Sequence, residues 1–190
     1  MNYQIFPLFF TRISTLLFFL IAIGFNFIGI SALISYFIII GVIFPAIISM
    51  RLCLLNESGV ALTITEDSQW AIYILGFPAQ EQRSALKNIG FFSKERFHHF
   101  FLISFLGKFC AQIACIAMLI CDYSNGSNLL ATLFALVCLL AFASNGAWSL
   151  YQAIFHQWQY ETLLTNTGSI WYQGFWPASK SKKTLFERLI

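Results

Sequence analysis

Long apolar runs alternate with shorter polar stretches along this chain of 190 residues. The interval between Arg12 and Arg51 carries no charged residue, and a helix needs about 20 mostly apolar residues to cross a bilayer. The segment Gly24–Phe27 interrupts the interval with glycine and asparagine, which favour a turn. The pattern therefore predicts one membrane-spanning helix over residues 7–25 and a second over 31–50.

Two further apolar runs in the second half predict spanning helices over residues 97–121 and 129–154. The polar segment 122–128 between them is rich in Asn, Ser and Gly, which are typical of turns. The chain is thus expected to be an all-α membrane protein whose four transmembrane helices form two hairpins. Every Lys and Arg except Lys108 lies on one side of these spans, so the positive-inside rule predicts that both termini and the loop 51–96 are cytoplasmic.

The two cytoplasmic segments share a second pattern. Residues 60–65 and 70–75 are rich in β-branched and aromatic side chains and flank the polar stretch 66–69, which is typical of a β-hairpin. Residues 160–164 and 170–173 repeat this pattern around 165–169. A step of glycine, aromatic residues and proline follows each hairpin, and because proline fits the first turn of a helix, short helices are predicted over 79–89 and 178–189.

This repeated order predicts an internal duplication, with a first repeat over residues 1–96 and a second over 97–190. The cytoplasmic hairpin and helix occupy 60–90 in the first repeat and 160–190 in the second. Chance similarity is the alternative, because two hairpins of ordinary composition also resemble each other.

Composition supports a membrane protein. Hydrophobic residues make up 58% of the chain, charged residues 10%, and the mean hydropathy is +0.73, whereas about 25% of a soluble domain is charged. A formal net charge of +3 excludes nucleic-acid binding as the main role. The abundance of Phe and Ile and the short outer loops favour a bacterial inner membrane. A signal peptide cleaved after Ser31-Ala32 is disfavoured, because its basic region is weak and another apolar run follows at once.

Lys108 lies near the middle of the predicted span 97–121, where a cation costs about 2.5–3.5 kcal/mol on insertion scales. We expect it to face protein or water, near intramembrane polar residues such as Asn26 and Asn145. One interpretation is that Lys108 lines the path of an oligomeric pore or small transporter. The alternative is a lysine that extends toward the cytoplasmic headgroups.

Catalytic and metal chemistry find little support. The sequence has no G-x-S-x-G, Walker or Cys/His motif, so no catalytic residue and no cofactor is predicted. His98 and His99 are adjacent and would point about 100° apart on a helix. A metal site would need His156 to converge with one of them, and interfacial histidines are the simpler interpretation. Asp122 is expected to be a solvated turn residue.

The hairpin aromatics are of the types that anchor protein interfaces, and they form the predicted partner-binding set: Trp70, Tyr73, Trp171, Tyr172 and Trp176. The nearby cations would suit anionic lipid or an acidic partner: Arg83, Lys87, Lys182 and Lys183. The alternative is that these rings lie on the headgroup layer. The sequence predicts a non-enzymatic, homo-oligomeric protein that contacts membrane lipid and anchors or senses for a cytosolic partner, for example in a defence, toxin–antitoxin or secretion module.

Overall fold

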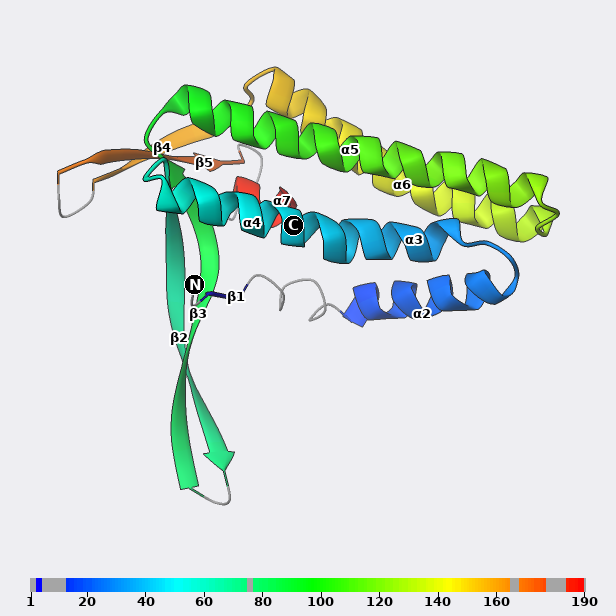
Figure 1. Ribbon diagram of the computed structural model, residues 1–190, viewed down its shortest axis with the longest axis horizontal. Coiled ribbons are helices and arrows are strands. Elements are labelled where there is room, and N and C mark those ends of the chain that lie inside the picture. The colour runs from blue at the N-terminus through cyan, green and yellow to red at the C-terminus, as the bar shows by residue number, and fades with distance from the viewer. Residues whose placement is uncertain (1–2, 5–12, 75–76, 165–167, 177–183, 190) are drawn as a thin grey trace. The chain divides into compact units, whose positions relative to one another are not determined.

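The computed structural model of the protein describes residues 3–4, 13–74, 77–164, 168–176 and 184–189. It is mostly helical, with three helices long and apolar enough to cross a membrane and a small, largely antiparallel sheet (Figure 1). The chain forms two compact units. Unit 1 comprises residues 1–7, 49–97 and 158–190, and unit 2 comprises 8–48 and 98–157.

The long helices follow the apolar runs. Helix α5 covers Lys94–Ser124 and helix α6 covers Leu129–Ile154, which confirms the helices predicted over 97–121 and 129–154. The third candidate span is the continuous helix Ala32–Glu57. Helix α2, Ile13–Phe27, is shorter, and residues 7–12 of the first predicted span lie outside the described residues. The four-span topology therefore stays a prediction.

Helix Ala32–Glu57 extends beyond residue 50, the predicted end of the second span, and consists of α3 (Ala32–Ile38), the π-helical turn η1 (Ile39–Ile43) and α4 (Phe44–Glu57). Pro45 has no N–H and cannot bond to the carbonyl four residues back. The π-helical turn lies directly before it, where the Phe44 N–H donates to the Ile39 carbonyl. The helix ends at Glu57, and Gly59, two residues later, has a positive φ of 70° that suits the residue after a C-terminal cap.

Asp122 is not the solvated turn residue that the sequence suggested. Its carboxylate accepts hydrogen bonds from the backbone N–H groups of Ser31 and Ala32 at 2.8 and 3.0 Å. The Ser31 hydroxyl also donates to it, at 3.1 Å. An acidic side chain thereby satisfies the first N–H groups of α3 and joins the end of α5 to the start of α3 within unit 2.

Unit 1 is built on a sheet. Strand β2 (Ala61–Ile74) pairs antiparallel with β3 (Phe77–Phe91) along its whole length. The opposite edge of β3 pairs with β1 (Tyr3–Gln4) and, through Phe91 and Tyr172, with β5. Strand β5 (Ile170–Phe175) also pairs antiparallel with β4 (Gln159–Leu164), the last strand of the order β1-β3-β5-β4. A short helix, α7 (Leu185–Leu189), follows.

Two predictions for the first hairpin are wrong. The polar stretch 66–69 continues strand β2 instead of forming a turn, and the helix predicted over 79–89 is strand β3. Every residue of this region except Lys87, which lies at a β-bulge, has a partner in the register, for example Gln69 opposite Gln82. Pairing with a neighbouring strand therefore overrides the local turn and helix preferences.

The second hairpin is confirmed, with β4 and β5 paired from Gln159↔Phe175 to Leu164↔Ile170. Of the helix predicted over 178–189, the structure describes α7, and residues 178–183 lie outside the described residues. The β2–β3 hairpin is much longer than β4–β5. The internal duplication stays a prediction.

Aromatic rings fill the interior of unit 1. Phe97, in the first turn of α5, is fully buried and lies edge-on to Phe91, Trp158 and Tyr160, with ring centroids 5.5–5.8 Å apart. Such pairs contribute about 0.5–1.5 kcal/mol each beyond their buried area. This cluster fixes the first turn of α5 against the β4–β5 hairpin.

Candidate functional site

An exposed apolar surface lies at the end of the β4–β5 hairpin in unit 1. Leu164 is 73% exposed, Phe92 63% and Ile170 48%. Leu163 is also exposed, and Trp171 is half-buried. We call these five residues the hairpin-tip surface.

Strand pairing and one hydrogen bond position these side chains. Leu163 pairs with Trp171 and Leu164 with Ile170, and since successive residues of a strand point to opposite faces, each pair occupies a different face. The Trp171 Nε1–H donates to Ser169 Oγ at 2.9 Å. The Phe92 ring lies edge-on to the Trp171 ring, with centroids 6.1 Å apart. The surface is thus held in place by the strands and by its own rings.

Lys94 lies beside this surface at the start of α5. Its Nζ lies 5.1 Å from the centroid of the Tyr172 ring and 5.7 Å from that of Tyr160, within the range of cation–π attraction. One helical turn later, Phe97 lies against Gly174, where a Cβ would overlap its ring. The first turn of α5 therefore packs on the β4–β5 hairpin around Tyr160, Tyr172 and Gly174.

The structure places the predicted partner-binding residues in different settings. Trp171 and Tyr172 are half-buried in β5, whereas Trp176 is buried, with the Arg188 guanidinium 4.4 Å from its ring centroid. Burial lowers the pKa of Arg188 from its ordinary, very high value. Trp70 and Tyr73 lie in strand β2, opposite Glu81 and Pro78, and their side chains lie outside the described residues.

Two of the four predicted cations, Lys182 and Lys183, lie outside the described residues. Arg83 lies in strand β3 and pairs with Ser68 of strand β2, and Lys87 lies at the β-bulge of β3. Sequence reasoning missed Phe92, Leu163, Leu164 and Ile170. The sequence contained a signal for these residues, because they are apolar and lie outside every predicted membrane span.

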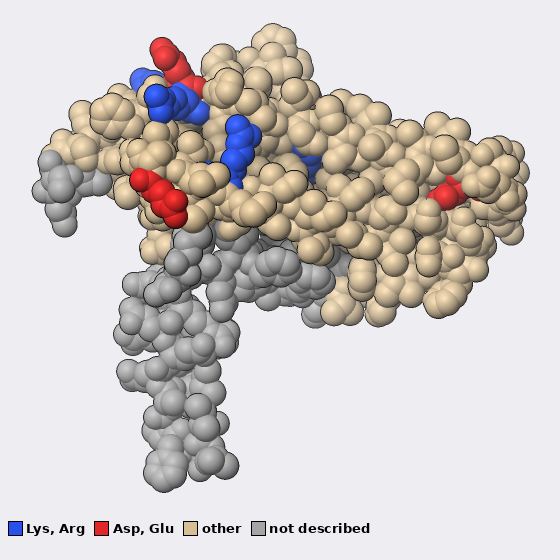
Figure 2. Space-filling view, viewed as in Figure 1, with Lys and Arg blue, Asp and Glu red and all other residues tan. Residues whose placement is uncertain are grey.

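The predicted intramembrane polar residues lie on separate helices of unit 2, Asn26 on α2, Lys108 on α5 and Asn145 on α6, and Lys108 is the centre of a second candidate site. Lys108 is half-buried on α5, with its Nζ 5.9 Å from the centroid of the Phe44 ring, directly after the π-helical turn. Asn26 and Asn145 are exposed, and the Asn145 side chain donates to the Ala141 carbonyl at 3.2 Å. Figure 2 shows how sparse charge is along the long apolar helices.

Gln112, four residues after Lys108 on α5, is buried at 3% exposure. Its Nε2 donates to the Phe142 carbonyl of α6 at 3.3 Å, while its Oε1 has no hydrogen-bond partner among the described residues. Gly146 of α6 provides the space for this amide, because a Cβ there would overlap Gln112 Oε1. Gln112 therefore links α5 to α6 through a polar contact inside the helical unit.

The histidines converge more than expected. His98 and His156 stack with ring centroids 3.8 Å apart and an interplanar angle of 24°. His156 has a positive φ of 52° and directly follows Phe155, the C-terminal cap of α6, and the Gln157 N–H donates to the Gln152 carbonyl. Parallel stacking brings ring faces together, whereas a metal is held by ring nitrogens. In the described part of the chain, no group of three or more His, Cys, Asp or Glu residues is placed to hold a metal ion.

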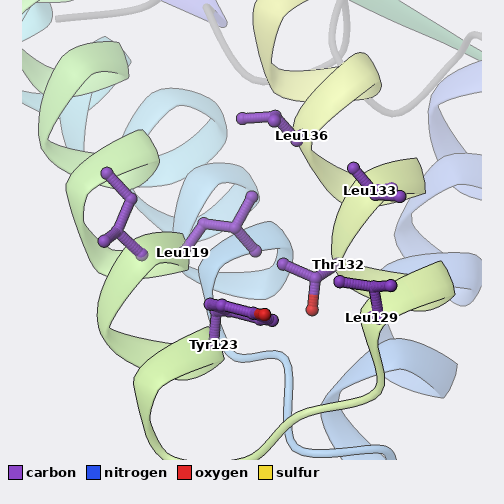
Figure 3. Close-up of a pocket in the computed structure, with 7 residues that line it drawn as sticks. Leu119, Tyr123, Leu129, Thr132, Leu133 and Leu136 are labelled. Carbon is purple, nitrogen blue, oxygen red and sulfur yellow. The ribbon is translucent and has the colours of Figure 1, made fainter.

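A shallow apolar groove of about 280 Å³ lies between α5 and α6 (Figure 3). Leu119 and Tyr123 of α5 face Leu129, Leu133 and Leu136 of α6 across it. Because both helices are candidate membrane spans, hydrocarbon is the medium that such a lining suits. Ile120 and Thr132 also line the groove, so its lining is apolar apart from the hydroxyl groups of Tyr123 and Thr132.

No protein-family model matches the sequence, and comparisons with curated proteins and with solved structures give no match either. In the described part of the chain, the fold is mostly helical, with three helices long and apolar enough to cross a membrane and a small, largely antiparallel sheet.

Proposed function

We propose that this is a non-enzymatic integral membrane protein that docks a partner protein through the hairpin-tip surface of unit 1. The observation that carries the proposal is that Phe92, Leu164 and Ile170, at or next to the sheet and outside the candidate spans, are about half exposed or more. The Phe92 ring contacts the Trp171 ring on one face, and Leu164 pairs with Ile170 on the other, and neighbouring exposed apolar side chains of this kind are typical of an interaction site. Trp171 supplies an aromatic anchor of the kind that dominates binding energy.

The place of this surface in the chain supports an aqueous rather than a lipid neighbour. Phe92 precedes α5 and residues 163–171 follow α6, so all of them lie outside the candidate spans. We place both termini and unit 1 in the cytoplasm of a bacterial inner membrane, in accordance with the distribution of Lys and Arg.

The test compares tip variants with a matched control in native membranes. The double variant Leu164→Asp, Trp171→Ala is expected to lose a stoichiometric partner that the unchanged protein retains in mild detergent, measured by native mass spectrometry. Gln159→Ala, at an exposed position of the same strand, is the control and should retain the partner. Retention of every partner by a correctly inserted double variant would contradict the proposal.

One observation favours a second candidate function, an oligomeric pore or small transporter. Lys108 lies against Phe44 beside a π-helical turn, and π-helical turns inside α-helices are frequent at functional sites. This candidate predicts conductance in planar bilayers that changes with Lys108→Ala and reverses its ion preference with Lys108→Glu. A silent, correctly assembled oligomer would count against the pore.

A further inference from the structure

The apolar groove between α5 and α6 lies within unit 2 and has a volume of about 280 Å³ (Figure 3). We call it the α5–α6 groove. It extends along α6 from Leu129 to Leu136, which is about 10 Å at 1.5 Å per residue. Leu129 is the first residue of α6, and each leaflet of a bilayer contains about 15 Å of hydrocarbon. With α5 and α6 as membrane spans, the groove therefore fits within the hydrocarbon of the leaflet next to the turn 125–128.

The groove is aliphatic along its length and has a polar group at one end. The Thr132 hydroxyl donates to the Asn128 carbonyl at 2.9 Å and lies 2.9 Å from the Ser127 hydroxyl, so it needs no further partner. Tyr123 lies one residue before the end of α5 and is 51% exposed. Its hydroxyl therefore belongs to the end of the groove that is nearest the turn. This order of groups matches a hydrocarbon chain that is attached to a polar group.

We propose that the α5–α6 groove binds one acyl chain of a membrane phospholipid, with the ester end of the chain beside Tyr123. The inference goes beyond the docking function and rests only on the membrane location of α5 and α6. Inside a bilayer there is no hydrophobic driving force between apolar surfaces, so van der Waals packing decides what fills a hollow. An empty groove would leave its lining without partner atoms, whereas a chain lying in it contacts side chains of both helices.

The volume of the groove fits part of a single chain. A water molecule takes about 30 Å³ in the liquid, so 280 Å³ is the space of about nine waters. A methylene group is of similar size. The groove therefore accommodates one chain over part of its length, and the remainder continues into the bilayer.

Protein occupants suit the groove less well. A stable protein–protein interface uses about 20–30 residues on each side, whereas seven residues line the groove. A peptide would also bring backbone polar groups into hydrocarbon, where each needs a hydrogen-bond partner. The lining contributes only two hydroxyl groups, and that of Thr132 is already bonded. Neither a second copy of this chain nor a partner segment therefore matches the groove as closely as an acyl chain.

The experiment uses the full-length protein in phosphatidylcholine nanodiscs that contain a small fraction of phosphatidylcholine with a diazirine near the ester end of one chain. Light attaches this lipid to the residues that it contacts, and tandem mass spectrometry locates them. Leu129 lines the groove and Leu130 does not, although Leu130 is the more exposed of these neighbours, at 76% against 56%. We expect Leu129 to receive at least about three times the label of Leu130, because a chain in the groove contacts it from more sides.

Two matched variants test whether the label depends on the space in the groove. Leu133→Trp places an indole in the groove, whereas Leu130→Trp adds the same ring outside it on the same helix. The first should lower the label on Leu129 by about threefold or more, because the indole takes the place of the chain, and the second should leave it unchanged. Leu140, half exposed and outside the groove, should be labelled equally in both variants if both are correctly inserted.

Label that follows exposure alone, with more on Leu130 than on Leu129, would overturn the inference and indicate only the lipid that surrounds any span. Equal label on Leu129 in the two variants would overturn it as well. Absence of label from both helices would reject the groove together with the membrane location of α5 and α6. The docking function is judged separately, because Leu164→Asp, Trp171→Ala changes unit 1 alone and is read from the native partner.

Discussion

Single glycines decide how tightly neighbouring elements approach in both units. Gly146 lets the Gln112 amide lie against α6, and Gly174 admits the Phe97 ring and the Leu185 side chain against β5. In each case a hydrogen atom stands where any other residue would place a Cβ. The glycines therefore mark contacts that a substitution will disturb in a predictable direction.

Gly146→Ala is expected to destabilise unit 2 by roughly 1–3 kcal/mol, because the new methyl group displaces Gln112 and breaks its bond to the Phe142 carbonyl. The measurement is the free energy of unfolding in mixed micelles titrated with SDS. Gly107→Ala, at a helical glycine with nothing within 4 Å, is the matched control and should be neutral or stabilising by up to about 1 kcal/mol. If Gln112→Ala does not restore the stability lost in Gly146→Ala, this account of the contact is wrong.

Gly174→Ala is expected to destabilise unit 1, because its Cβ would overlap Phe97 and Leu185, both fully buried. Overpacking of this kind costs roughly 1–3 kcal/mol. Thermal unfolding followed by tryptophan fluorescence reports on the unit, since Trp158, Trp171 and Trp176 lie within it. Gly90→Ala is the control, because its Cβ would meet Trp171 Cβ at an ordinary 3.5 Å. Equal melting of the two variants would contradict the packing described for Phe97.

At the scale of the element, helices α3 and α5 are joined by Asp122. Its carboxylate receives two backbone N–H groups and one hydroxyl from Ser31 and Ala32. A charge at the N-terminus of a helix acts both as a cap and through the helix dipole. One side chain thereby holds the start of one candidate span against the end of another.

Asp122→Ala is expected to lower the free energy of unfolding by about 1–2 kcal/mol, because it leaves the Ser31 and Ala32 N–H groups without their acceptor. Asp122→Asn keeps an acceptor oxygen but loses the charge. Its free energy of unfolding should therefore lie between those of the unchanged protein and Asp122→Ala. Ser124→Ala, which removes a hydroxyl bonded to the Cys121 carbonyl of its own helix, is the control and should change little. Equal stability of Asp122→Ala and Ser124→Ala would show that the hydrogen bonds of Asp122 contribute nothing to the free energy of unfolding.

The helices could be predicted from the sequence far better than the first hairpin. A bilayer demands a continuous apolar run, so α5 and α6 were readable from local composition alone. The state of residues 66–69 and 79–89 depends instead on pairing between strands up to 30 residues apart, from Ala61 opposite Phe91 inward. No local turn or helix signal contains that information.

In the hairpin-tip surface, too, some residues could be predicted from the sequence and others could not. Trp171 was predicted from its residue type, whereas Leu164 and Ile170 become an interaction surface only because β4 and β5 end together and leave them exposed. The hydrogen bond between Ser31 and Asp122 joins residues that are 91 positions apart in the sequence. Such contacts follow from the packing of the helices, which a single sequence does not specify.

At the scale of the whole molecule, the number of spans decides which side of the membrane each end of the chain occupies. α6 separates the turn after α5 from strand β4, so Asn125→Cys and Gln159→Cys should be modified by a membrane-impermeant maleimide from opposite sides of sealed vesicles. Peptide mass spectrometry distinguishes these labels from the five native cysteines. Labelling of both positions from one side would contradict α6 as a span.

An N-terminal epitope tag then tests whether α2 crosses the bilayer. α2 has 15 residues in Ile13–Phe27, about 22 Å of helix at 1.5 Å per residue, which falls short of roughly 30 Å of hydrocarbon unless residues before Ile13 extend it. If four helices cross, protease added on the Gln159 side of sealed vesicles will remove the tag. We expect this result, because every Lys and Arg except Lys108 then lies on one side. Removal of the tag only from the Asn125 side would instead establish three spans.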